Sequence, residues 1–251
     1  IAKMSYSQNP YQPSGSFYPA AVAESGVDER VEFIRKTYTH LTAAVLGFAF
    51  IIAALLQIDA IGGPGGICET MLRTPFSYLF AMFGLMAVSW ICEKWACHAA
   101  SKRTQYAGLI VYAAAEALFF TPMVWLAENY AKGSLVIAVA VTLAVFVGLT
   151  LSVFMTKADF SFLRSALMIG TLGAIAVAIC MMFTGVTQGW FLILMGVFVI
   201  LACGYILYNT SNVLHHYPVG MHVAASLALF ASLTTLLWYV LHLVMLLSGR
   251  D

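Results

Sequence analysis

The sequence predicts an all-α integral membrane protein with seven transmembrane helices. Of its 251 residues, 62% are hydrophobic and only 9% are charged, whereas soluble proteins carry about 25% charged residues. Seven apolar runs reach the roughly 20 residues that a helix needs to cross a bilayer core. The runs are continuous, and this excludes the alternating stretches of about ten residues that are typical of membrane barrels.

The predicted spans cover residues 37–56, 75–92, 105–126, 134–154, 162–183, 189–208 and 222–247, so residues 25–251 form one transmembrane domain. Before the first span, the segment "SGVDERVEFIRKTYTHL" places acidic residues early and basic residues later, as a helix dipole prefers. We expect an amphipathic interfacial helix that leads straight into the first span. The stretch "IGGPGG" at 61–66 lacks the Gly-Lys-Ser/Thr of a phosphate loop and is expected to be a flexible external loop.

Residues 1–24 are expected to form a disordered cytoplasmic tail, because they are rich in Pro, Ser, Gln and Tyr and lack a periodic apolar face. They do not resemble a cleavable secretion signal, since the first apolar run begins only near residue 37. Met4 is a candidate for the natural start.

The distribution of basic residues predicts a cytoplasmic N-terminus and an external C-terminus. With that orientation Arg73, Lys132 and Arg250 lie outside, and the other nine of the 12 Lys and Arg residues lie inside. The net charge of +1 comes without any arginine-rich run or basic stripe, so nucleic acid is not an expected partner.

Enzymatic and metal-binding motifs are missing from the sequence. The five cysteines are scattered over apolar segments, so no disulfide framework is expected. Cys92, Cys97 and His98 are interpreted as residues of a helix end, since zinc sites usually pair two closely spaced ligands with a second such pair. Because no Gly-x-Ser-x-Gly elbow is present either, we expect a protein that is not an enzyme and that holds no metal or cofactor.

Glu116, in "YAAAEALFFTP", is the one acidic residue placed near the middle of a predicted span. An ionisable group at that depth is costly and by default marks a functional site that faces the bundle interior. Two interpretations stay open. The residue is either a neutral glutamic acid that joins two helices by hydrogen bonds, or part of a proton or cation pathway.

The last span carries small and polar residues at alternating spacings of four and three, which place them on one face of a helix. They are Met221, Ala225, Ala228, Ser232, Thr235, Tyr239 and His242. Such a face turns inward in lipid, because small residues allow close packing and hydroxyl groups bond across helices. This span is therefore a candidate for the central helix, through tight packing alone or with a role in transport.

The stretch "YNTSNVLHHYPVGMH" at 208–222 is predicted to be a helix hairpin at the cytoplasmic surface. Asn209, Asn212 and His216 share one helix face by their spacing, and Pro218 and Gly220 turn the chain. The polar members of the hairpin are Asn212, His215, His216 and His222. Because no second histidine cluster completes a coordination sphere, the histidines are expected to be solvated and to sense cytoplasmic pH.

Three motifs resemble one family of membrane proteins. They are "FIRKTYTHL" before the first span, "MTKADFSFLRSALMIG" across the fourth boundary and "LYNTSNVLHH" at the end of the sixth span. Together with the seven spans they are similar to the Bax inhibitor family, most closely to its bacterial YccA-like branch. The resemblance implies two layers of three helices around a central seventh helix, and a location in the bacterial inner membrane.

The resemblance also implies two functions. Members of the family are described as pH-sensitive calcium leak channels that are built around two acidic residues on the last two spans. Members of the YccA-like branch instead bind the membrane AAA protease FtsH and moderate its activity. This chain has Asn209 and Ser232 at the positions of the acidic pair, so the pH sensor and its calcium site are not carried over.

The leading hypothesis is therefore a membrane protein that binds and modulates an FtsH-type protease, or accompanies it in a complex, within the lipid bilayer. One alternative is a cation, calcium or proton leak pathway centred on Glu116, with Asn209, Ser232 and Thr235 as its polar lining. Another is a structural accessory subunit of a larger membrane assembly, to which the aromatic tail would bind.

Overall fold

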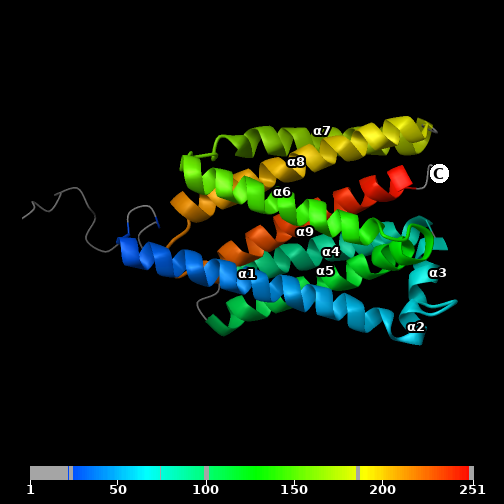
Figure 1. Ribbon diagram of the computed structural model, residues 1–251, viewed down its shortest axis with the longest axis horizontal. Helices are drawn as coiled ribbons and strands as arrows, with labels where there is room; N and C mark the ends of the chain where they lie inside the picture. The colour runs from blue at the N-terminus through cyan, green and yellow to red at the C-terminus, as the bar shows by residue number, and fades with distance from the viewer. Residues whose placement is uncertain (1–21, 23–24, 74, 99–101, 185–186, 249–251) are drawn as a thin grey trace, which may run out of the picture.

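The computed structural model describes residue 22 and residues 25–73, 75–98, 102–184 and 187–248. The regular elements in these ranges are all helices, so the predicted all-α class is confirmed (Figure 1). They are α1 (Val27–Leu56), α2 (Asp59–Gly62), α3 (Ile67–Arg73), α4 (Pro75–His98), α5 (Lys102–Tyr130), α6 (Ser134–Thr156), α7 (Leu163–Thr184), α8 (Gln188–His215) and α9 (His222–Ser248).

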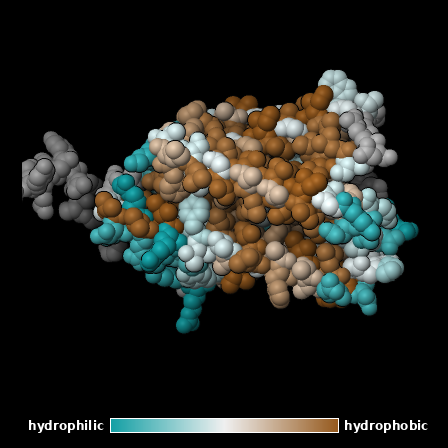
Figure 2. Space-filling view, viewed as in Figure 1, coloured by the Kyte–Doolittle hydropathy of each residue, from teal (hydrophilic) through white to brown (hydrophobic). Residues whose placement is uncertain are grey.

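Within the described residues, six helices are long and apolar enough to cross a membrane, namely α1, α5, α6, α7, α8 and α9. The helix α4 has 24 residues, and its described apolar stretch covers Phe83–Cys92. Figure 2 shows a hydrophobic surface over the middle of the bundle, with hydrophilic residues gathered at its two ends. An apolar surface of this extent around the middle of a helix bundle identifies a multi-pass membrane protein.

Two connections differ from simple loops. The expected interfacial helix and the first span form the single helix α1, which begins at Val27 with Asp28 and Glu29 in its first turn. The expected flexible loop at 61–66 instead contains the last two residues of the short helix α2 and the connection to α3, and the Trp125 indole N–H donates a 2.7 Å hydrogen bond to the Gly62 carbonyl. This long-range bond fixes the loop against α5.

The helices α5 and α9 are the most buried of the six candidate spans. The last span is expected to be the central helix, and α9 indeed contacts α1, α4, α5, α6 and α8. Small residues permit these contacts, since Ala224 and Ala225 are almost completely buried and leave room for the neighbouring backbones. The inner position is shared, because α5 contacts α1, α3, α4, α6 and α9.

The remaining long helices lie on two sides of α9. On one side α5 contacts both α1 and α4, and on the other side α8 contacts both α6 and α7 (Figure 1). The helix α7 packs mainly against α8 and is the least buried of the candidate spans. These contacts are compatible with the expected arrangement of two layers, which stays a prediction.

We expect Ala225→Leu to lower the free energy of unfolding by about 1–3 kcal/mol, because the larger side chain has no space at a position with 0% exposure. Ala140→Leu is the matched control, since Ala140 is exposed on α6. Thermal and denaturant unfolding in mild detergent would measure both changes. Equal effects of the two substitutions would contradict the central position of α9.

Candidate functional site

A polar cavity of about 320 Å³ lies between α4, α5, α8 and α9. Its polar lining consists of Ser89, Tyr112, Tyr208, Asn209, Asn212 and Tyr217, and its α9 wall consists of Ala224, Leu227, Ala228 and Ala231. The alanines of α9 leave the space that the cavity occupies. The lining offers hydroxyl and amide groups without a carboxylate, so the cavity is suited to neutral hydrogen-bonding groups or water.

Glu116 lies one helical turn from this cavity on α5. Its side chain is 6% exposed, and the Tyr112 hydroxyl donates a 2.7 Å hydrogen bond to Glu116 Oε1. Ser89 is a further hydrogen-bond partner of Tyr112. The Tyr112 phenol therefore connects the polar cavity to the one acidic side chain that is buried in the described part of the chain.

The two positions at which the resemblance implies acids are joined by a neutral hydrogen bond. The Asn209 amide donates to Ser232 Oγ over 2.7 Å, and the Ser232 hydroxyl donates to the Ala228 carbonyl over 2.9 Å. An amide and a hydroxyl carry no titratable proton at physiological pH. This pair therefore links α8 to α9 without the shared proton of two carboxylates.

Thr235, the fourth residue of the predicted polar pathway, lies apart from the other three. Its side chain is exposed, and its hydroxyl donates a 2.7 Å hydrogen bond to the Ala231 carbonyl of its own helix. It does not belong to the lining of the polar cavity. The structure thus brings Asn209 and Ser232 together beside the cavity, and it places Thr235 on an outer face of α9.

The predicted hairpin residues take separate positions at the end of the bundle where α8 passes into α9. His216 Nε2 lies 3.2 Å from Asp159 Oδ2, and His215 Nδ1 lies 3.0 Å from the carbonyl of Ser211. His222 packs against His40, with ring centroids 5.1 Å apart, and its Nε2 lies 3.3 Å from the hydroxyl of Tyr106. Asn212 lines the polar cavity.

No group of three His, Cys, Asp or Glu side chains that could hold a metal ion exists among the described residues. The cysteines at 68, 92, 180 and 203 are free thiols. Cys97 and His98 belong to the side chains outside the description, so the interpretation given to them stays a prediction.

The loop between α6 and α7 is fastened to α8. Ser211 Oγ accepts a 2.9 Å hydrogen bond from the Phe160 N–H. The Ser161 N–H donates to Asp159 Oδ1 over 2.9 Å, and this bond, together with His216, lowers the pKa of the Asp159 carboxyl to about 2. The stabilisation from ionised Asp159 is therefore complete above its unfolded pKa of about 3.9 and is lost only as the pH falls toward 2.

The chain before α1 is anchored to the connection between α8 and α9. Val22, although it lies within the predicted tail, is completely buried, and its N–H donates a 2.9 Å hydrogen bond to the Tyr217 carbonyl. The Val22 carbonyl accepts hydrogen bonds from Ser25 Oγ at 2.8 Å and Arg30 Nε at 3.1 Å. Since Tyr217 lines the polar cavity, this anchor lies at its edge. Residues 1–21, 23 and 24 are outside the described part.

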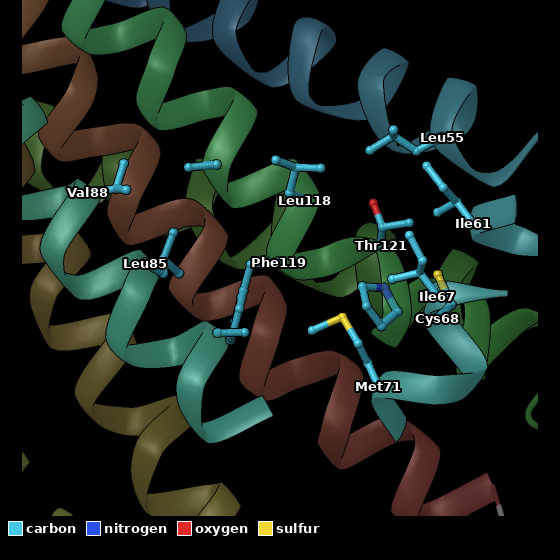
Figure 3. A pocket seen from close by; sticks show the side chains of 13 residues that line it. Leu55, Ile61, Ile67, Cys68, Met71, Leu85, Val88, Leu118, Phe119 and Thr121 are labelled. Carbon is cyan, nitrogen blue, oxygen red and sulfur yellow. The ribbon is translucent and has the colours of Figure 1, made fainter. Parts of the chain in front are cut away.

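A second cavity, of about 290 Å³, lies near α2 and α3 against the middle of α5 and is mostly apolar. Figure 3 shows Leu118, Phe119 and Thr121 projecting from α5 and Ile67, Cys68 and Met71 from α3. The Thr121 hydroxyl donates to the Ala117 carbonyl of its own helix over 2.6 Å. Because convergent polar groups usually mark a functional site, the cavity beside Glu116 is the better candidate.

Comparison with known proteins agrees with the resemblance of the three motifs. Residues 30–250 match the sequence model of the family described as "Bax1-I: Inhibitor of apoptosis-promoting Bax1". The chain belongs to the Bax inhibitor family. It is similar to Bax inhibitor 1 of Schizosaccharomyces pombe, with 26% identity over 235 residues, which cover 92% of this chain and 82% of the relative.

The sequence of this Bax inhibitor family member does not single out the tyrosines of the cavity. Tyr112 precedes Glu116 by four residues, which is the spacing of helix neighbours and the one available signal. Tyr208 and Tyr217 flank the hairpin but have no such relation to an acidic residue. Their place in the lining depends on how α8 and α9 meet.

We expect Ser232→Ala to lower the free energy of unfolding by about 0.6–1.7 kcal/mol, because the Asn209 amide loses its acceptor across two helices. Thr235→Val is the control, since the Thr235 hydroxyl bonds to its own helix and is exposed. Unfolding in bicelles would measure both. A loss for Thr235→Val as large as that for Ser232→Ala would contradict a structural role of the pair.

Proposed function

We propose that this Bax inhibitor family protein acts by binding, and modulates or accompanies a membrane-bound AAA protease of the FtsH type. The observation that carries the proposal is the anchor of Val22 on Tyr217. This anchor holds the end of the N-terminal tail, just before α1, at the edge of the polar cavity. A partner that binds the residues before Val22 thereby acts, through the bond of Val22 to Tyr217, on the connection between α8 and α9.

The neutral pair beside the cavity supports the same function. Gating by protons needs a group whose charge changes with pH, and Asn209 and Ser232 supply none. The motifs that resemble the YccA-like branch add further support. In this proposal the protein is not an enzyme and acts through protein contacts in the bilayer.

The proposal includes a definite placement in the bacterial inner membrane. The helix α4 supplies the seventh span, since its 24 residues exceed the roughly 20 that a crossing requires. The N-terminus lies in the cytoplasm and the C-terminus outside, as the distribution of basic residues supports. The N-terminal tail is then on the cytoplasmic side, where the resemblance implies that it is available to the protease.

We expect the full chain, purified in mild detergent from native membranes, to bring a membrane AAA protease with it. Deletion of residues 1–21 removes the proposed binding segment and is expected to abolish the protease signal in mass spectrometry. The deletion leaves Val22 and its bond to Tyr217 in place, so the melting temperature is expected to stay unchanged. Isolation of the full chain without any protease would overturn the proposal.

A second candidate function is a cation or proton leak, and the bond between Tyr112 and Glu116 favours it. A polar cavity whose wall residue Tyr112 is hydrogen-bonded to a buried carboxyl group is an arrangement suited to one half of an ion pathway. Glu116 would take up the ion or proton, and the cavity would provide access from the α8–α9 end of the bundle.

For that candidate we expect Glu116→Gln to abolish ion or proton flux in proteoliposomes, because an amide cannot carry the charge or the exchangeable proton. Glu128→Gln is the control, since Glu128 lies on the same helix but is exposed. Flux would be followed with a pH-sensitive dye and a calcium-sensitive dye inside the vesicles. Equal flux through both variants rules out this pathway.

A further inference from the structure

We propose that a pocket beside the start of α7 binds the headgroup of an anionic phospholipid. The pocket has a volume of about 500 Å³ and adjoins the polar cavity, with which it shares Tyr208, Asn212 and Tyr217. We call it the headgroup pocket, and its polar lining consists of Ser161, Arg164, Tyr208, Asn212, His216 and Tyr217. This inference is independent of a protease partner.

The lining of the headgroup pocket has the chemistry that a phosphate group requires. Phosphate oxygens accept hydrogen bonds, and the pocket offers a guanidinium group, an amide and several hydroxyls as donors. No carboxylate belongs to its lining. An arginine can also bind two phosphate oxygens at once through its planar fork of donors.

The positive charge of Arg164 is available to a ligand. In the described part of the chain no acidic side chain lies within ion-pair distance of it. The nearest acidic residue in sequence is Asp159, which already accepts from the Ser161 N–H and lies 3.2 Å from His216. The charge at the mouth of the pocket is therefore not neutralised by the protein itself.

The surface of α7 next to the headgroup pocket identifies the ligand as a lipid. Met168 and Leu172 follow Arg164 at spacings of four and eight, so the three residues lie in one row along the helix. Both apolar side chains are largely exposed, at 57% and 63%. A headgroup at Arg164 would thus place an acyl chain along this row, within the bilayer.

The neighbouring loop places the headgroup pocket at the level of the membrane interface. Met155 and Phe162 flank the connection between α6 and α7 and are 83% and 72% exposed. Apolar side chains with this exposure are stable when they enter the acyl region, while the polar groups beside them stay at the headgroups.

The test uses the full chain in phosphatidylcholine nanodiscs with and without phosphatidylglycerol. Native mass spectrometry of the released protein would count the lipids that stay bound. We expect the unchanged protein to retain phosphatidylglycerol in preference to phosphatidylcholine. Arg164→Gln is expected to reduce that preference about fivefold, since one basic residue near an anionic surface contributes about 1 kcal/mol.

Arg103→Gln is the matched control, because Arg103 is also an exposed arginine in the first turn of a membrane helix but does not line the pocket. The Arg103→Gln variant is expected to keep the preference for phosphatidylglycerol over phosphatidylcholine. Met168→Gln tests the acyl row, and we expect it to weaken retention while the melting temperature stays unchanged. Equal preference in Arg164→Gln and the unchanged protein would overturn the proposal.

Inorganic phosphate distinguishes a lipid from a free anion. We expect phosphate added to the released protein to leave the bound phosphatidylglycerol in place, since it cannot replace the contacts of the acyl chain with Met168 and Leu172. Displacement of the lipid by inorganic phosphate, with phosphate bound in its stead, would show a simple anion pocket and would overturn the assignment to a lipid.

Discussion

The need to satisfy polar groups without water governs the interior of this bundle. In the bilayer a buried hydroxyl, amide or carboxyl group is costly unless it finds a partner within the protein. The bond from Tyr112 to Glu116 and the bond from Asn209 to Ser232 meet this requirement at two neighbouring places. The first lies within α5, and the second joins α8 to α9. Both border one polar cavity, so the chemistry of the protein is concentrated where these helices meet.

The small side chains of α9 determine where this polar region can exist. Alanines at 224, 228 and 231 line the cavity, while larger apolar residues such as Leu229 and Leu236 fill the bundle on other faces of the helix. A helix with leucine at all of these positions would close the space. The same alanines that permit close packing thus leave one side of α9 open to the polar groups of α5 and α8.

Much of the fold follows from the sequence, because a bilayer imposes strict limits on the length and polarity of a spanning helix. Six of the spans, the continuation of α1 from the interface and the inner position of α9 are all predictable on this basis. The burial of Glu116 is predictable too. The folded α2–α3 segment and the anchor of Val22 are not, since each depends on a hydrogen bond to a distant residue, Trp125 and Tyr217 respectively. Thr235 shows the same limit, because helical spacing alone cannot tell which turns of a face are covered by a neighbour.

The anchor of Val22 also determines how the protein responds to mechanical load. A pull on the residues before Val22 reaches the bond to the Tyr217 carbonyl and the three bonds to the Val22 carbonyl before it stretches α1. These few bonds are far weaker than a helix embedded in a bilayer, whose removal exposes about 20 apolar residues to water. The contact would therefore yield first and release the connection between α8 and α9, while all spanning helices stay in place. The contacts of Val22 would thus separate under a load that leaves the transmembrane helices folded.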